Sequence, residues 1–188
     1  MYCNFKQLSS LQLKKNKIEN IEAFSNIIFN KLTVLDLSEN KISNIQPLSK
    51  CELSQLAELR LGNNEIENID CFSECKFKDL KKLFLNNNKI VNINGIGNCG
   101  FTGLEELVLN DNLIENLQPL MNCNMNNLVL FNLQSNQISD INILMNLNFD
   151  KMKSFQINKN KIDKDDRMNQ KIINTIKETS PFLLELKW

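Results

Sequence analysis

The side chains best suited to chemistry in this chain are its six cysteines. Five of them recur in one column at 24 residues or its multiples, and Ile27 and Leu147 complete that column: Cys3, Cys51, Cys75, Cys99 and Cys123. A column shared with Ile and Leu predicts buried, reduced thiols that pack as small hydrophobic side chains. The alternatives are structural disulfides, which need an oxidising compartment, and zinc, for which Cys71-x-x-x-Cys75 is only an isolated pair.

Catalytic constellations are hard to find in this sequence. The chain has no histidine, which removes the commonest general base and the usual serine and cysteine triads. The segment Asn94-Gly95-Ile96-Gly97 lacks the lysine and the spacing of a phosphate-binding loop. We therefore predict a non-enzymatic protein with no cofactor, no catalytic residue and no metal site.

The strongest pattern is an asparagine that returns every 24 residues: Asn16, Asn40, Asn64, Asn88, Asn112, Asn136 and Asn160. Each copy stands in a frame of the type Leu-x-x-Leu-x-Leu-x-x-Asn-x-Ile, for example Leu80-x-x-Leu83-x-Leu85-x-x-Asn88-x-Ile90. A buried amide without partners would cost free energy. We therefore expect these side chains to bond backbone groups of their own repeat and of the next one, as a structural ladder.

The apolar columns of the frame predict the elements that surround this ladder. The Leu-x-Leu pair alternates with a period of two, as a short strand with one buried face requires. Later apolar columns, spaced by three and then two residues, indicate short turns or 3₁₀ segments. A second polar column, beginning with Asn20 and Asn44, is explained as turn chemistry.

Together these columns predict an α/β solenoid, with a parallel sheet on the concave face and short turns or 3₁₀ segments on the convex face. The array of seven Asn-marked repeats occupies residues 1–162 and opens on a truncated half repeat, because Cys3 and Phe5 are in register with Ile27 and Phe29. No polar cap precedes that end, and we expect either that a partner covers it or that the chain packs in a larger assembly.

Residues 163–188 are predicted to cap the other end. Asp163 to Asp166 resemble a helix start, and the apolar face of the helix follows at Met168, Ile172, Ile173 and Ile176. Pro181 then stops the helix. The last apolar side chains are expected to fold back over the last repeat: Phe182, Leu183, Leu186 and Trp188.

This frame resembles the leucine-rich-repeat class typified by the regulatory subunit of protein phosphatase one. The same class resembles the spliceosomal A-prime protein and the leucine-rich light chain of axonemal dynein. The resemblance implies a curved right-handed array with a capping helix, and it makes phosphatase regulation, axonemal assembly and ribonucleoprotein scaffolding the expected settings. A cytoskeletal or ciliary location is implied in the same way.

The composition bears on partners and location. Lys+Arg and Asp+Glu are equal at 22 each, so no net field attracts nucleic acid or an anionic membrane. No apolar core of a signal peptide opens the sequence, and no run is long and uncharged enough to span a bilayer. We expect a cytoplasmic protein that does not enter the membrane.

Binding is predicted at the variable positions of the repeat, which lie on the strands and point away from the core. There Phe84 and Val108 are apolar beside charged neighbours, which is the usual anatomy of a protein-binding patch. We expect Phe84 to face solvent and to contribute little to folding. The predicted partner-binding residues are Arg60, Lys82, Phe84, Glu106, Val108, Leu130 and Asn132.

The sequence thus predicts an interaction module, an adaptor or structural subunit of a larger intracellular complex, that binds a protein on its concave face. A phosphatase-regulatory subunit is one alternative. An RNA-associated scaffold is another, and it would use the lysines on the loops beside Phe84: Lys14, Lys15, Lys17, Lys41 and Lys89.

Overall fold

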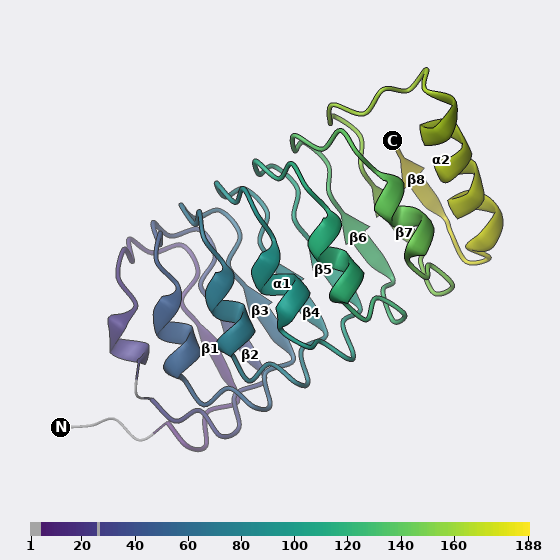
Figure 1. The fold of residues 1–188 in the computed structure, drawn as a ribbon. Coiled ribbons are helices and arrows are strands. Elements are labelled where there is room, and N and C mark those ends of the chain that lie inside the picture. Colours follow the sequence, from purple (N-terminus) through teal and green to yellow (C-terminus); the bar gives the residue numbers. More distant parts are fainter. Residues whose placement is uncertain (1–4, 26) are drawn as a thin grey trace.

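The computed structural model describes residues 5–25 and 27–188 and shows one elongated array of stacked turns (Figure 1). Its strands form a single sheet in which every described pairing is parallel and the order follows the chain. The predicted α/β solenoid is therefore confirmed. The strands are β1 (Ser10–Gln12), β2 (Val34–Asp36), β3 (Glu58–Arg60), β4 (Lys82–Phe84), β5 (Glu106–Val108), β6 (Leu130–Asn132), β7 (Ser154–Gln156) and β8 (Glu185–Lys187).

Each strand is three residues long, and its central residue points into the core. The register aligns these central residues across the sheet, for example Leu59 with Leu83 and Leu83 with Leu107. The residue on either side of the centre points outward, as the period of two predicts. The outward residues of all eight strands consequently share one face.

The opposite face carries one short helical segment in each repeat. Neighbouring strands lie about 4.8 Å apart, closer than such segments can pack, so the array curves towards the sheet. The sheet therefore lines the concave face, and the prediction of short convex segments is confirmed. These segments are η1 (Glu22–Phe24), η2 (Gln46–Lys50), η3 (Asp70–Glu74), η4 (Gln118–Asn122) and η5 (Asn142–Asn146), with α1 (Asn94–Asn98) in the fourth repeat.

Only α1 is α-helical among these convex segments of the described chain, and two glycines let it pack closely. A Cβ on Gly95 would lie 1.9 Å from the Ile69 carbonyl oxygen, and one on Gly97 would lie 2.5 Å from that of Pro119. Both distances are far below van der Waals contact. Gly95 and Gly97 are therefore explained by stacking against the neighbouring repeats, not by a ligand.

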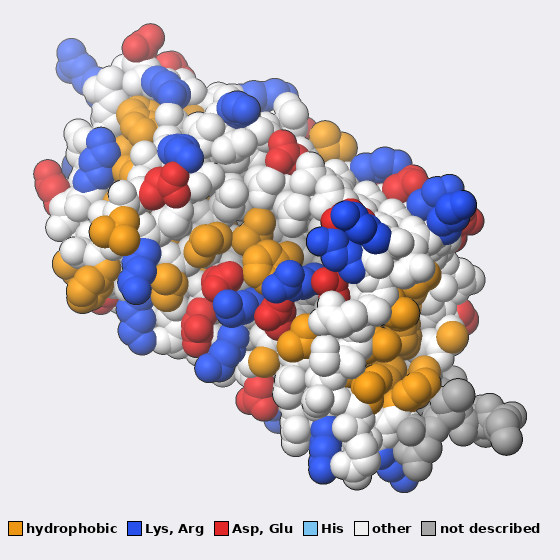
Figure 2. Space-filling view, turned by 180° about the vertical axis from the view of Figure 1, so that it is seen from behind, with side chains coloured by type: hydrophobic (Ala, Val, Ile, Leu, Met, Phe, Trp, Pro, Cys, Tyr) orange, Lys and Arg blue, Asp and Glu red, His pale blue; other side chains and the backbone are white. Residues whose placement is uncertain are grey.

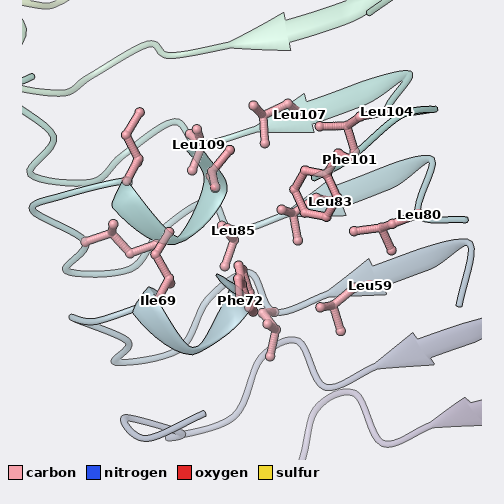
Figure 3. Close-up of a cluster of buried hydrophobic side chains, with 14 of the residues drawn as sticks. Leu59, Ile69, Phe72, Leu80, Leu83, Leu85, Phe101, Leu104, Leu107 and Leu109 are labelled. Atoms are coloured by element: carbon pink, nitrogen blue, oxygen red, sulfur yellow. The ribbon is translucent and has the colours of Figure 1, made fainter. Parts of the chain in front are cut away.

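The core is a continuous column of leucine, isoleucine and phenylalanine between the two faces (Figure 3). Leu83 and Leu85 reach it from the strand side, while Phe72 and Ile69 reach it from the convex side, and all four are fully buried. Each repeat thus completes the core of its neighbours, which explains why the apolar columns recur so regularly.

Backbone turns join the two faces in every repeat. The residue before each ladder asparagine has left-handed φ values between 53° and 58°, from Lys15 to Lys159. The second polar column accepts a bond from the amide two residues later, as when Asn68 Oδ1 accepts from Asp70 N at 2.7 Å. The interpretation of that column as turn chemistry is confirmed.

The cysteine column differs from the prediction in two repeats. Cys51 and Cys75 are buried, whereas Cys99 and Cys123 are only half-buried; Cys3 lies outside the described residues. Cys99 follows α1 with helical backbone angles, unlike the extended Cys51 and Cys75, and the space beside Gly100 is open. The buried thiols donate to backbone carbonyls, as Cys51 Sγ does to Phe24 O at 3.0 Å.

The C-terminal segment contains the expected helix, α2 (Arg167–Thr179), whose start is capped by the Asp166 carboxylate. Its buried face consists of Ile172, Ile173 and Ile176. The inclusion of Met168 in that face was wrong, because it lies in the first turn, beyond the core, and is 51% exposed.

After α2 the chain forms β8, an eighth strand that the sequence pattern did not predict. Leu183, Leu186 and Trp188 take the three leucine positions of the repeat frame and pack against the core. Phe182 precedes that frame and is exposed, so the expectation that it folds over the last repeat was wrong. No helix in residues 5–25 and 27–188 combines the length and apolar character needed to cross a bilayer.

Candidate protein-binding face

The seven residues predicted to bind a partner lie on four consecutive strands, β3 to β6, and form two rows. In one row the register places Phe84 between Arg60 and Val108, and Asn132 follows Val108. The other row places Lys82, Glu106 and Leu130 on neighbouring strands. Members of one row lie about 4.8 Å apart on adjacent strands, and the two rows run side by side, two residues apart along each strand, so they form one continuous surface.

The charged members of this surface are paired within the chain. Lys82 Nζ donates to Glu106 Oε1 at 2.7 Å, and this bond raises the pKa of Lys82 above its usual value. Arg60 Nε donates to the Glu58 carboxylate. Glu58 is also the direct neighbour of Lys82 across β3 and β4, and the apolar side chains lie beside these charged residues rather than between them. Figure 2 shows apolar groups in the middle of the sheet side with Lys, Arg, Asp and Glu side chains around them.

Phe84 does not face solvent freely, contrary to the expectation from the sequence. The Arg60 guanidinium carbon lies 5.2 Å from the centre of the Phe84 ring, within the range of a cation–π contact. Phe84, Val108 and Leu130 are all half-buried by their neighbours. Each therefore combines an accessible apolar surface with some contribution to folding.

Asn132 has a structural role besides its place in the row. Its Oδ1 accepts a bond from Gln134 N at 2.9 Å, at the point where β6 ends. Asp36 does the same for Ser38 N at 2.9 Å and is buried. A side chain at an outward strand position can thus stabilise the turn that follows its own strand, which the sequence pattern alone did not indicate.

A small hollow beside Phe84 was also missed. It has a volume of about 150 Å³ and is lined by Phe84, Arg60, Lys14, Glu39 and the residues around Gly62. Gly62 occupies a position where the flanking repeats have Ser38 and Asn86, and the Asn86 amide folds over it. A glycine at an otherwise polar column was the signal that could have located this hollow.

The asparagine ladder lies at the edge of the sheet, away from the two rows. Asn88 Nδ2 donates to Leu61 O and Leu85 O, both at 3.0 Å, and its Oδ1 accepts from Ile66 N at 3.0 Å. Leu61 and Ile66 belong to the preceding repeat, so the expected direction, towards the next repeat, was wrong. The reason is that the strand of the preceding repeat ends directly beside the Asn88 side chain.

The same pattern holds from Asn40 to Asn160, with the bond to the preceding leucine at 3.0 Å in every repeat. Asn16 differs, because it is exposed and bonds only within its own turn, to Leu13 O at 2.9 Å and to Lys14 O. In the other repeats the side-chain Oδ1 accepts from a backbone amide of the preceding repeat, and no such repeat precedes Asn16 in the described residues.

The lysines considered for RNA binding lie on the loops rather than on the strand rows. Lys14 and Lys15 both pair with Glu39, at 3.0 and 3.6 Å, and the pKa of Glu39 is lowered mainly by its bond to Lys14. Lys89 pairs with Glu65 at 3.1 Å, and Lys41 with Glu19 at 3.6 Å. Acidic neighbours thus offset most of this positive charge.

Comparison with known proteins shows which family and which solved structures this architecture resembles. Residues 6–66 match the model of the family described as leucine rich repeat. Solved structures of the same fold cover nearly the whole chain. The fold is a leucine-rich repeat solenoid. A search of the curated proteins finds no match.

Three similar structures show how widely this solenoid occurs. An internalin, InlF from Listeria monocytogenes, is 24% identical over 97% of this chain and 48% of its own, with a TM-score of 0.76. The ectodomain of the Arabidopsis thaliana receptor kinase GASSHO1/SCHENGEN3 is 22% identical over 96% of this chain and 24% of its own, with a TM-score of 0.68.

The third is the functional domain of InlJ from Listeria monocytogenes, described as including a cysteine ladder. It is 17% identical over 97% of this chain and 44% of its own, with a TM-score of 0.59. The chain described here spans less than half the length of each of the three. At these identities the likeness establishes the fold alone.

Proposed function

We propose that this leucine-rich repeat solenoid is a non-catalytic interaction module that binds a protein segment on the concave face of β3 to β6. The observation that carries the proposal is the two-row surface, in which Phe84 and Val108 are adjacent, Leu130 lies diagonally from Val108 on the next strand, and all three are half-buried while the flanking charges are paired. Apolar anchors inside a polar rim are typical of binding hot spots.

Leucine-rich repeat domains generally mediate protein–protein contacts. The GASSHO1/SCHENGEN3 ectodomain, which shares this fold, was solved in complex with Casparian strip integrity factor 2. In our proposal the present chain acts as an adaptor or fixed subunit of a larger intracellular complex. A phosphatase-regulatory role is the specific form of this proposal that the sequence resemblance supports.

An intracellular location is part of the same proposal. The thiols of Cys51 and Cys75 donate to backbone carbonyls, at 3.0 and 3.3 Å, as reduced cysteines do. Such thiols fit a reducing compartment. Cell fractionation with an antibody to the chain tests the location directly.

The test of the binding face is affinity purification from cells, followed by mass spectrometry and by binding measurements with the captured protein. Phe84→Ala and Val108→Glu should each weaken the complex by about 2 kcal/mol or more, as expected for central anchors. Met121→Ala is the matched control, because it removes an exposed apolar side chain from the convex face.

Three outcomes would overturn parts of the proposal. Binding that survives both concave changes and is lost on removal of residues 1–5 would place the interface at the N-terminal end. Capture of RNA with a steep salt dependence would favour the ribonucleoprotein alternative. Capture of partners other than a phosphatase catalytic subunit would remove the phosphatase-regulatory form.

A further inference from the structure

The segment that leads into the last strand, β8, carries an apolar surface that is separate from the two rows. Leu184 is 86% exposed and Phe182 is 60% exposed, which makes them the most exposed large hydrophobic side chains of the described chain. The register aligns Glu185 with Ser154, so Phe182 and Leu184 take the places that Lys151 and Lys153 occupy one repeat earlier. Lysine suits a solvent-facing position, whereas Phe and Leu at these positions leave apolar surface in contact with water.

These two residues lead into β8, which is the edge strand of the sheet in the described residues. Within the described residues β8 pairs with β7 alone. Glu185 N donates to Lys153 O at 3.0 Å, and Lys187 O accepts from Ile157 N at 2.7 Å, so Glu185 and Lys187 turn their backbone groups towards β7. Because alternate residues of a strand bond to opposite sides, the N–H and C=O of Leu186 point to the open edge.

The side chains of β8 are complementary to a reversed copy of themselves. Glu185 and Lys187 flank Leu186 on the concave face, where their own side chains pair at 2.6 Å. In an antiparallel pair centred on Leu186, each Glu185 would stand opposite the Lys187 of the other copy. The two central leucines would exchange both of their free backbone bonds.

We propose that this edge is a self-association surface, at which β8 of a second copy of the chain pairs antiparallel with β8 about a two-fold axis. Such an interface is isologous, so one strand supplies both halves of each contact. Phe182 and Leu184 of each copy would lie against the end of the partner strand and lose their exposed apolar surface. This surface is independent of the concave rows, because none of the seven residues of the two rows belongs to β8.

The pairing makes a charge-swap experiment decisive. Sedimentation velocity over a concentration series should show a reversible monomer–dimer equilibrium for the unaltered chain. Glu185→Lys and Lys187→Glu should each weaken dimerisation about tenfold or more, because each places like charges opposite one another. The double exchange, Glu185→Lys with Lys187→Glu, restores complementarity and should recover the dimer.

Two further variants separate this pairing from a general loss of charge or structure. Leu184→Asn should weaken the dimer, whereas Lys50→Glu, on the exposed convex segment η2, should leave it unchanged. Circular dichroism of every variant should match that of the unaltered chain, and variants that fail this criterion are left out of the comparison.

A monomer at every concentration, or a dimer that the single charge reversals do not weaken, would overturn the proposal. The double exchange failing to recover association would also overturn it, because a symmetric antiparallel pair requires that recovery. An unrelated extended peptide that binds this edge while the chain stays monomeric would show strand addition by another partner instead.

Discussion

The ladder loops and the outward strand positions are built from the same repeat but obey different constraints. The ladder position is asparagine in all seven repeats, and from Asn40 to Asn160 the bond to the preceding repeat is 3.0 Å each time. The third residue of each strand points outward, and its type changes from repeat to repeat, with only glutamine used twice: Gln12, Asp36, Arg60, Phe84, Val108, Asn132, Gln156 and Lys187. Buried backbone groups must be paired, whereas a solvent-facing side chain has many acceptable identities. Positions that repeat the same residue are therefore the ones that folding requires, and positions that vary lie on the surface available for recognition.

The sharpest contrast is between two phenylalanines, one inward and one outward. Phe131 is fully buried and stacks on Phe155 with ring centres 5.6 Å apart, whereas Phe84 is half-buried. We expect Phe131→Ala to cost about 3 to 5 kcal/mol of unfolding free energy. Phe84→Ala should cost about 1 kcal/mol. Urea unfolding measures both, and equal losses would show that the outward face is as constrained as the core.

The ladder should respond almost as strongly as the core. Asn88→Ala removes a buried amide that has partners in two repeats, and we expect a loss of about 2 to 3 kcal/mol, because loop backbone groups are left unpaired. Asn16→Ala is the matched control, since this asparagine is exposed and bonds only its own turn. Equal shifts in the urea midpoints of the two variants would contradict the ladder interpretation.

The accessibility of the convex side can be measured in each repeat through the reactivity of its cysteine. Burial raises the pKa of Cys51 to about 12 and that of Cys123 to about 11. The hydrogen bond with the Cys71 thiol, together with burial, raises the pKa of Cys75. All three thiols are therefore protonated at neutral pH, which slows alkylation.

We expect native alkylation of Cys99 and Cys123 to be roughly tenfold faster than that of Cys51 and Cys75, because the first two are half-buried. Mass spectrometry of peptides after timed labelling measures the four rates, and labelling in urea is the control. Equal native rates would show that the four repeats open to the same extent.

The smallest expected effect concerns Glu185, where an outward position is held by contacts within the chain. Bonds from Lys187, Ser154 and Gln156 lower the pKa of Glu185 from 4.5 to about 2. A lowered folded-state pKa stabilises the fold above pH 4.5, and this contribution is lost as the pH falls towards 2.

Glu185→Gln should therefore flatten the dependence of the melting temperature on pH between about 4.5 and 2. The measurement belongs at low protein concentration, so that the proposed self-association does not contribute. Identical pH profiles for the two proteins would mean that these contacts do not form in solution.

The sequence was informative wherever geometry repeats. The frame around Asn88 predicted the strand, the bend and the short convex segment, because each column has one structural task. The adjacency of residues on the two outward rows was also predicted, since a fixed 24-residue period places Phe84 beside Val108 in any stacked array.

Three features could not be predicted, each for a physical reason. The period gives the neighbours of Asn88 but not the direction in which its amide points. Half-burial of Phe84 depends on the conformation of Arg60, a long side chain from another repeat. The strand β8 was missed because α2 lengthens the interval between Phe155 and Leu186 beyond the regular period.

The direction of the asparagine bonds gives the solenoid a polarity along its length. Ile66 N is satisfied only when Asn88, in the following repeat, is in place. A repeat emerging from the ribosome therefore keeps an open backbone amide until its successor has been synthesised and folded. Synthesis from the N-terminus to the C-terminus therefore follows the order in which these hydrogen bonds form. The backbone amide of each repeat is paired only after the next repeat has folded against it.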